Sequence, residues 1–307
     1  MPSIQTLCLI VLLSFALPAV SAEPSQISFQ SLGDDTRISA SLLRPDGEGP
    51  FPAVVIAHDC SGLGPHSSGA PMRWGMELVA QGYVVVIPDS FTPRGFADGV
   101  CTVASSDSSI ASGYVRDADT YAALKFLRGL AYVDGKHVGV MGGSHGGWTT
   151  LASMTNLSRD NDAVKQTKQD GFAAGIALYP SCASPYGSWV AKRERGMIGP
   201  IMAYSGVYKP LAPVLILIGD KDDWTPAEPC RYLVETSRAA GYAIDIVVYP
   251  GAYHSFDSDH PVRYDARRTN SNSPTGKGAT TGGDAEAWSD ARKQVAAFFD
   301  LHLKQGK

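Results

Sequence analysis

The sequence lacks a strong excess of charge of either sign. It contains 26 Lys and Arg residues against 30 Asp and Glu residues, which gives a formal net charge of −4. Proteins that bind nucleic acid or anionic membranes usually carry a clustered excess of Lys and Arg. The sequence also lacks His, Cys and Asp residues at the spacing of a metal site. We therefore expect neither a nucleic-acid partner nor a metal or other cofactor.

Apolar runs long enough to cross a bilayer are lacking as well. The apolar run over residues 7–20 is short, and residues 20–22, Val-Ser-Ala, offer a small-residue cleavage site. This pattern predicts a secretory signal peptide over residues 1–22, although no Lys or Arg precedes the run. We expect the mature chain, residues 23–307, to be secreted or periplasmic and to have no membrane contact once the signal is removed.

Cysteine is scarce. Of the five cysteines, Cys8 lies in the signal segment, and the other four are Cys60, Cys101, Cys182 and Cys230. In an exported protein these four would face an oxidising compartment, but they allow three disulfide pairings and the spacing alone does not choose one. The remaining length of about 285 residues suits a single α/β domain with a large core.

Strand and helix patterns alternate along the mature chain. Two leading strands are predicted at residues 27–30 and 38–43. Continuous apolar runs, typical of strands buried on both faces of a parallel sheet, cover residues 53–57, 83–87, 174–179, 214–218 and 244–249. Helical patterns cover residues 71–81, 114–130, 226–240 and 285–303. The alternation predicts a mostly parallel sheet with helices on both faces, whose functional site lies beyond the carboxyl ends of the strands.

Two segments interrupt this alternation. Residues 186–209 are long and mixed, with Trp189 and Tyr204 among polar neighbours, and we expect them to form a flap over the site. Residues 257–284 are polar and rich in Gly, Ser, Thr and Asn, which predicts a surface loop.

The most informative motif lies at residues 137–147, which read H-V-G-V-M-G-G-S-H-G-G. An apolar strand pattern breaks at Gly142 and a helix-compatible segment follows at residues 148–154. This is G-x-S-x-G between a strand and a helix, the setting of a nucleophile elbow that lifts the Ser144 hydroxyl clear of the sheet. The alternative is an ordinary glycine-rich turn in which Ser144 caps the helix.

A serine nucleophile needs a base within hydrogen-bond reach, and in this arrangement the histidine comes last in the chain. His254 follows the strand predicted at residues 244–249, at the same sheet edge as Ser144. His260 falls in the polar segment and His302 lies on the final helix. We therefore assign His254 as the base.

The base must in turn be oriented by an acid that lies between Ser144 and His254 in the sequence. Three candidates, Asp220, Asp222 and Asp223, follow the strand predicted at residues 214–218. We assign Asp222, three residues past the glycine that ends the strand. Asp220 and Asp223 stay open as alternatives, with a helix cap or an ion pair to a neighbouring lysine as their other roles.

Acyl transfer also needs N–H donors for the negative charge that develops on the substrate oxygen. The N–H of His145 lies at the start of the predicted helix, where negative charge is favoured. The second donor is expected from the loop after the strand at residues 53–57, and we assign the N–H of Cys60.

Together these residues resemble the dienelactone hydrolase branch of the α/β-hydrolases, over nearly the whole mature chain. The motifs that carry the resemblance, besides the Ser144 elbow, are His58-Asp59-Cys60-x-Gly62, Pro88-Asp89-Ser90-Phe91 with Arg94-Gly95, Gly219-x-x-Asp222-x-x-x-Pro226 and Gly251-x-x-His254-Ser255-Phe256. The resemblance implies an α/β-hydrolase fold. It also implies that the loops bearing Cys60 and Cys101 follow neighbouring strands, as do those bearing Cys182 and Cys230. We therefore expect the disulfides Cys60–Cys101 and Cys182–Cys230.

The sequence departs from the family in two respects. The dienelactone enzymes have Cys at the elbow, whereas Ser144 stands here. They hold a substrate carboxylate with two arginines, of which one matches Arg94 and the other falls on Ser258. An anionic dienelactone is therefore not the expected substrate. Arg94 remains a candidate substrate contact, and an aromatic wall for the pocket is expected from Trp148, Trp189, Trp224 and Tyr253.

These features favour an exported serine hydrolase that cleaves small carboxylic esters through a Ser144–His254–Asp222 triad and an acyl-enzyme. One alternative is a serine peptidase or aminopeptidase on the same framework. Another is a catalytically silent binding protein that keeps the fold and the pocket, because a fold alone does not imply activity.

Overall fold

The computed structural model describes residues 23–104, 112–156, 164, 170–195 and 200–304. The predicted signal peptide, residues 1–22, lies outside these ranges. Among the helices that the structure describes, none is both long enough and apolar enough to cross a membrane.

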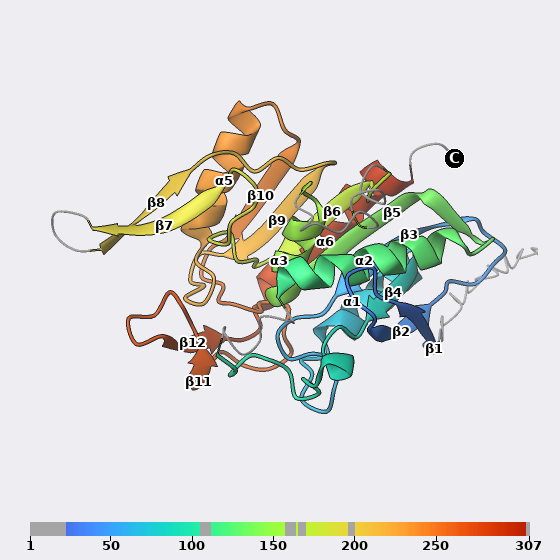
Figure 1. Ribbon diagram of the computed structural model, residues 1–307, viewed down its shortest axis with the longest axis horizontal. Helices are drawn as coiled ribbons and strands as arrows, with labels where there is room; N and C mark the ends of the chain where they lie inside the picture. Colours follow the sequence, from blue (N-terminus) through green and yellow to red (C-terminus); the bar gives the residue numbers. More distant parts are fainter. Residues whose placement is uncertain (1–22, 105–111, 157–163, 165–169, 196–199, 305–307) are drawn as a thin grey trace, which may run out of the picture.

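An eight-stranded sheet forms the centre of the molecule, in the order β1-β2-β4-β3-β5-β6-β9-β10 (Figure 1). Its strands are β1 (Ser25–Gln30), β2 (Arg37–Leu43), β3 (Phe51–Ala57), β4 (Val84–Pro88), β5 (Val133–Gly143), β6 (Ala174–Leu178), β9 (Val214–Gly219) and β10 (Ile244–Tyr249). The pairs β1–β2 and β2–β4 are antiparallel, and all the other pairs are parallel. Every residue of β4, β6 and β9 is buried, as the continuous apolar runs predict. The mostly parallel sheet is confirmed.

Helices cover both faces of this sheet (Figure 1). They are α1 (Ala70–Ala80), α2 (Gly113–Arg128), α3 (His145–Ser153), α5 (Ala227–Ala239) and α6 (Ala285–Leu303), with a 3-10 turn, η1, at Thr92–Arg94. In the view of Figure 1, α2 and α3 lie in front of the sheet, where they pack on each other and on β5. Behind the sheet, α1 packs on β3 and β4, and α6 packs on β5 and β6. The helix bounds differ from the predicted ranges by three residues or fewer.

The segment at residues 186–209 is not a flap over the site. It contains an antiparallel hairpin of β7 (Val190–Arg195) and β8 (Pro200–Ser205), which extends away at the left of Figure 1. Its aromatic residues pack elsewhere: the Trp189 ring stacks on Tyr204 at 5.8 Å, and Tyr204 stacks on Tyr232 of α5 at 5.0 Å. None of its described residues lines the cavities beside Ser144. The flap prediction is wrong because these apolar side chains cover α5.

The segment at residues 257–284 is more ordered than the predicted surface loop. It contains a second antiparallel hairpin, β11 (Arg263–Thr269) and β12 (Lys277–Thr281), in the lower part of Figure 1. The sequence of β11, R-Y-D-A-R-R-T, has no apolar alternation, and small residues of β12 such as Ala279 provide the burial. The strand pattern was therefore absent from the sequence, although this segment lines the site.

Two disulfides join segments that follow the carboxyl ends of the strands. Cys60, after β3, is bonded to Cys101, after β4, and Cys182, after β6, is bonded to Cys230 in α5. This is the pairing expected from the family resemblance. The bonds close loops with sequence separations of 41 and 48 residues. Bonds of this kind typically stabilise a folded chain by about 2–4 kcal/mol each.

Candidate active site

Ser144 occupies a tight turn between β5 and α3. Its backbone lies at φ 55° and ψ −116°, a region that residues with a side chain rarely adopt. The turn packs against the end of β3, and a Cβ added to Gly146 would lie 2.0 Å from the carbonyl oxygen of Ala57. A Cβ on Gly142 would lie 2.5 Å from the same oxygen. Glycine is therefore required at both positions, as expected for a nucleophile elbow.

Three side chains from three strand ends meet at this turn. The Ser144 Oγ lies 2.9 Å from His254 Nε2, and His254 Nδ1 lies 2.7 Å from Asp222 Oδ2. All three residues are buried. A carboxylate beside Nδ1 places the imidazole proton on that nitrogen, which leaves Nε2 free to accept the proton of the serine hydroxyl. The arrangement has the geometry of a nucleophile, a base and an orienting acid.

Asp222 is held in place by the turn that follows it. Its Oδ1 accepts hydrogen bonds from the backbone N–H groups of Trp224 at 3.0 Å and Thr225 at 2.8 Å. The Thr225 hydroxyl lies 2.9 Å from Asp222 Oδ2 and 3.0 Å from His254 Nδ1. Thr225 thus contacts both the acid and the base. Nothing in the sequence marks this threonine except its place three residues after Asp222.

The two alternative acids serve neighbouring loops. The Asp220 carboxylate accepts the N–H of Gly251 at 2.7 Å. The Asp223 carboxylate accepts the N–H and the hydroxyl of Thr280 at 2.8 and 2.7 Å, which ties the β11–β12 hairpin to the end of β9. Of the three candidates, the structure brings Asp222 to His254.

Below the histidine lies a buried polar pair, Tyr179 and Asp257. The Tyr179 ring packs edge-on against His254 at 4.7 Å, and its hydroxyl donates to Asp257 Oδ1 at 2.7 Å. The indole N–H of Trp74 donates to Asp257 Oδ2 at 2.7 Å. Burial raises the pKa of Asp257, although these two hydrogen bonds act in the opposite direction. The pair supports the inner side of the His254 ring.

Two backbone N–H groups beside Ser144 are left without partners. Among the residues that the structure describes, no acceptor binds the N–H of Cys60 or of His145. Both residues line a cavity together with Ser144. The loop that carries Cys60 is fixed by its disulfide and by a 2.7 Å hydrogen bond from the Val100 N–H to the Cys60 carbonyl. Paired free donors of this kind can bind a negatively charged oxygen.

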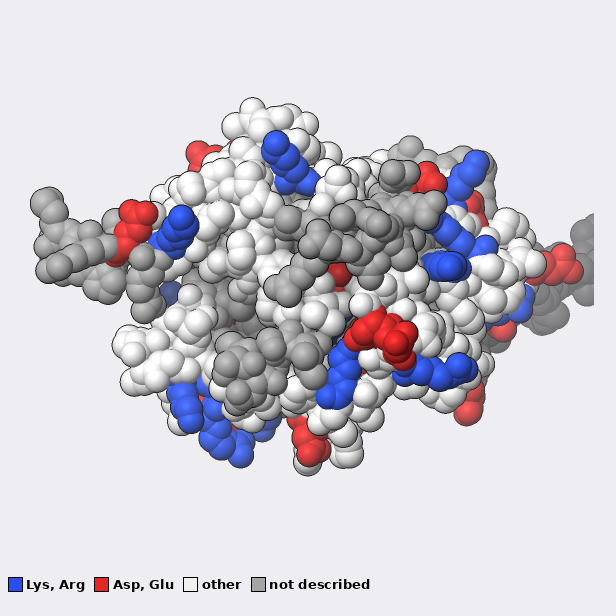
Figure 2. Space-filling view, viewed as in Figure 1, with Lys and Arg blue, Asp and Glu red and all other residues white. Residues whose placement is uncertain are grey.

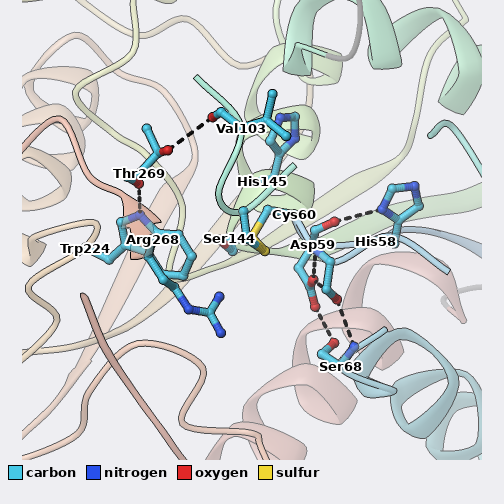
Figure 3. The surroundings of a disulfide bond; sticks show 12 residues. His58, Asp59, Cys60, Ser68, Val103, Ser144, His145, Trp224, Arg268 and Thr269 are labelled. Atoms are coloured by element: carbon cyan, nitrogen blue, oxygen red, sulfur yellow. Dashed lines mark hydrogen bonds between the residues drawn. A yellow bond between two sulfur atoms is a disulfide. The ribbon is translucent and has the colours of Figure 1, made fainter. Parts of the chain in front are cut away.

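Two cavities meet at Ser144, and Cys60 and Trp224 line both of them. The first cavity, of about 210 Å³, is also lined by Cys101, His145, Trp148 and Asn272. The second cavity, of about 260 Å³, is also lined by Asp59, His254 and Arg268. Figure 3 shows Ser144 next to Cys60, with Trp224 and Arg268 facing them from the other side.

Arg94 does not contact these cavities, contrary to expectation. Its side chain is 3% exposed, with Nη1 2.7 Å from Asp119 Oδ2 and Nη2 3.1 Å from Asp34 Oδ2. These two carboxylates raise the pKa of Arg94 against the effect of its burial. The guanidinium joins η1 to α2 and to the loop after β1, so Arg94 is removed from the candidate substrate contacts. Tyr253 is half-buried and also lies outside both cavity linings.

Arg268 is a cavity residue that the sequence did not indicate. Its guanidinium lies over the Trp224 ring at 4.7 Å, and that ring packs against His254 at 4.9 Å. In the described part of the chain, Arg268 makes no hydrogen bond, and its Nε lies 3.9 Å from the carboxylate of Asp265. Its position on β11 explains the omission, because that segment was expected to be a loop.

Acidic residues, His and Cys do not gather elsewhere into a metal site. Over the described ranges, no group of three or more of these residues could hold a metal ion. Charged side chains are scattered over the face seen in Figure 2, with several Lys and Arg at its lower left edge.

Comparison with known proteins shows the family of the chain. A sequence model of the dienelactone hydrolase family matches residues 38–302. A "Putative carboxymethylenebutenolidase" of Methylorubrum extorquens is 28% identical over 236 residues, which cover 76% of this chain and 72% of that protein.

Solved structures show the same fold. A crystal structure of a "Putative Dienelactone Hydrolase" from Klebsiella pneumoniae superposes with a TM-score of 0.60 at 19% identity, over 90% of this chain and 98% of that one. Thermogutta terrifontis esterase 2, phosphorylated by paraoxon, superposes with a TM-score of 0.58 at 16% identity, over 92% and 96% of the two chains. At these sequence identities, the superpositions show that the chains share the α/β-hydrolase fold and nothing further.

Proposed function

Since the chain belongs to the dienelactone hydrolase family, we propose that it is a serine hydrolase of small carboxylic esters that acts through an acyl-enzyme. The observation that carries this proposal is the pair of contacts at His254, 2.9 Å to Ser144 Oγ and 2.7 Å to Asp222 Oδ2. They supply the nucleophile and the base that ester cleavage requires.

The proposed reaction has two halves. In the first, Ser144 Oγ attacks the ester carbonyl while His254 Nε2 takes the hydroxyl proton, and Asp222 stabilises the imidazolium that forms. The N–H groups of Cys60 and His145 bind the oxygen that becomes negative. When this intermediate collapses, His254 gives the proton to the departing alcohol. In the second half, water attacks the acyl-enzyme with His254 again as base, and the acid leaves as Ser144 regains its proton.

The two cavities suggest where each half of the ester binds. His254 protonates the leaving oxygen and lines the second cavity, so we place the alcohol there, beside Arg268. His145, one of the proposed oxyanion donors, lines the first cavity. We therefore place the acyl group there, against Trp148 and Trp224. The Arg268 guanidinium, which makes no hydrogen bond in the described structure, offers donors to polar groups of the alcohol.

The cellular location is part of the proposal. Disulfides persist in oxidising compartments and are rare in reducing ones. The two disulfides therefore support export to the periplasm or the medium, with residues 1–22 as the signal and residues 23–307 as one hydrolase domain.

The size of the first cavity predicts the preferred acyl chain. Its volume of about 210 Å³ is small beside the roughly 300–1,000 Å³ of pockets for drug-sized ligands. We expect p-nitrophenyl acetate and butanoate to have kcat/KM values at least about tenfold above those of octanoate and dodecanoate, because each misplaced methylene is worth about 1–3 kcal/mol. The measurement is initial hydrolysis rates across chain lengths from C2 to C12.

A pair of variants checks that the first cavity sets this preference. Trp148→Leu, which widens it, should move the optimum to longer chains. Tyr264→Leu, at a residue that is 64% exposed on β11, should leave the profile unchanged. A wild-type optimum at C8–C12 would place the acyl chain elsewhere. A folded protein that cleaves no ester would instead favour the peptidase or the silent binding protein.

A further inference from the structure

A buried arginine lies behind the two proposed oxyanion donors. Arg116, near the start of α2, is 1% exposed. Its Nη1 donates to His145 Nδ1 at 2.7 Å, and its Nη2 donates to the carbonyl oxygen of His58 at 2.7 Å. His58 lies two residues before Cys60. One guanidinium therefore contacts both segments that carry the free N–H groups.

Among the described residues, this arginine makes no direct ion pair, although the more distant carboxylates of Asp119 and Asp59 favour its charged form. Within the described ranges, no Asp or Glu oxygen lies within 4.0 Å of the Arg116 guanidinium, and its buried Nε has no hydrogen-bond partner. The face of the Phe91 ring lies 4.7 Å from the guanidinium carbon. Arg94, the other buried arginine nearby, contacts two aspartates instead. A buried charge without a direct ion pair is costly, which makes this arginine a candidate for a role at the site.

The same arginine sets the state of the His145 side chain. A guanidinium can only donate hydrogen bonds, so His145 Nδ1 must accept, and the ring proton lies on Nε2. Burial, together with the charge of Arg116, holds the pKa of His145 well below its usual value. Burial also lowers the pKa of Arg116, to about 9, which leaves it protonated at neutral pH. His145 is therefore neutral, and the positive charge beside it belongs to Arg116.

The His145 ring is clamped between neighbours. It packs edge-on against Phe91 at 5.4 Å and lies 5.0 Å from the Trp148 ring. With the hydrogen bond from Arg116, these contacts fix the first residue of α3 relative to the loop after β3. Because Cys60 lies on that loop and His145 begins α3, these contacts also fix the distance between their two N–H groups.

We propose that Arg116 is a positioning residue for the oxyanion hole. It holds the segments of His58 and His145 together, and its buried charge favours the negative oxygen that the Cys60 and His145 N–H groups bind. A negative charge in direct reach of the site develops on the substrate oxygen in the transition state, where a prearranged positive charge at low dielectric has its largest effect. This inference rests on the proposed ester hydrolysis at Ser144.

The test compares three variants with the wild type on a short-chain p-nitrophenyl ester. Arg116→Met removes the charge and both hydrogen bonds and should lower kcat by about 10²-fold, similar to the loss of an oxyanion donor, with KM changed by less than about threefold. Arg116→Lys keeps the charge but cannot bridge both partners, and its kcat should lie between those of Arg116→Met and the wild type. Arg128→Met is the matched control, because Arg128 lies at the far end of α2 and donates to the Gly135 carbonyl at 2.9 Å. Its kcat should be that of the wild type.

Three results would overturn the proposal. The first is a kcat for Arg116→Met within about threefold of the wild type, and the second is a rise in the KM of that variant as large as its fall in kcat. The third is a kcat for Arg116→Lys no higher than that for Arg116→Met. If the Arg116 variants do not fold, His145→Leu decides, since it keeps the N–H and removes the acceptor of Arg116. An unchanged kcat in that variant would also contradict the proposal. Failure of the proposed function itself would show earlier, as a folded wild type without ester turnover.

Discussion

Replacing Ser144 by alanine is expected to lower kcat for ester hydrolysis by about 10⁵–10⁶-fold while KM stays unchanged. The hydroxyl forms the acyl-enzyme, so no other group at the site can take over its bond to the substrate. The substitution removes one oxygen from a side chain that is already buried, and folding should be preserved. The measurement is the steady-state rate on a short-chain ester, with the melting temperature measured alongside.

Ser237→Ala is the matched control for this experiment. Ser237 is also a fully buried serine, in α5, and its hydroxyl has no hydrogen-bond partner in the described structure. Its kcat should be that of the wild type. If Ser144→Ala kept more than about a hundredth of the wild-type kcat, the acyl-enzyme account would be wrong. The ester would then be cleaved by a different nucleophile or by direct attack of water without a metal.

Replacing Asp222 by asparagine should lower kcat by about 10⁴-fold. Asparagine has the same shape and can still accept the N–H groups of Trp224 and Thr225. Its amide nitrogen, however, would face His254 Nδ1 and stabilise the tautomer with the proton on Nε2. That proton would point at Ser144, and the imidazole could no longer act as a base. The measurement is kcat on the same ester at neutral pH.

The neighbouring aspartates provide two controls of the same chemistry. Asp220→Asn and Asp223→Asn change carboxylates that bind Gly251 and Thr280, so each should alter kcat by no more than a few-fold and act mainly on loop stability. If either control lost as much activity as Asp222→Asn, that residue would be the triad acid in solution, and the contact at His254 would need reassignment.

Much of the site could be predicted because its signals are local. The glycines around Ser144 lie where β3, β5 and α3 approach too closely for side chains. This need for glycine is visible in the sequence as a five-residue motif. The continuous apolar runs mark buried parallel strands, and Asp222 and His254 follow two of them. The sequence favoured Asp222 but left Asp220 and Asp223 open, since all three lie within four residues of one strand end.

The errors concern residues whose partners are distant in the sequence. Arg94 was expected to contact substrate because it matches a substrate-binding arginine of the family, and its actual partners, Asp34 and Asp119, are 60 and 25 residues away. Arg116 gave no signal, because on a helix it resembles any other arginine until the packing places it behind His145. Arg268 lies in a hairpin without strand periodicity. Tertiary contacts of this kind have no counterpart in a local pattern.

The most direct test of the central claim is to label the folded protein with a fluorophosphonate and locate the adduct by mass spectrometry. Such probes phosphonylate a serine only when a base activates it. We predict one adduct per chain, on the peptide that contains Ser144, and none in Ser144→Ala. An adduct on another residue, or no adduct on a folded and disulfide-bonded protein, would contradict Ser144 as the activated nucleophile.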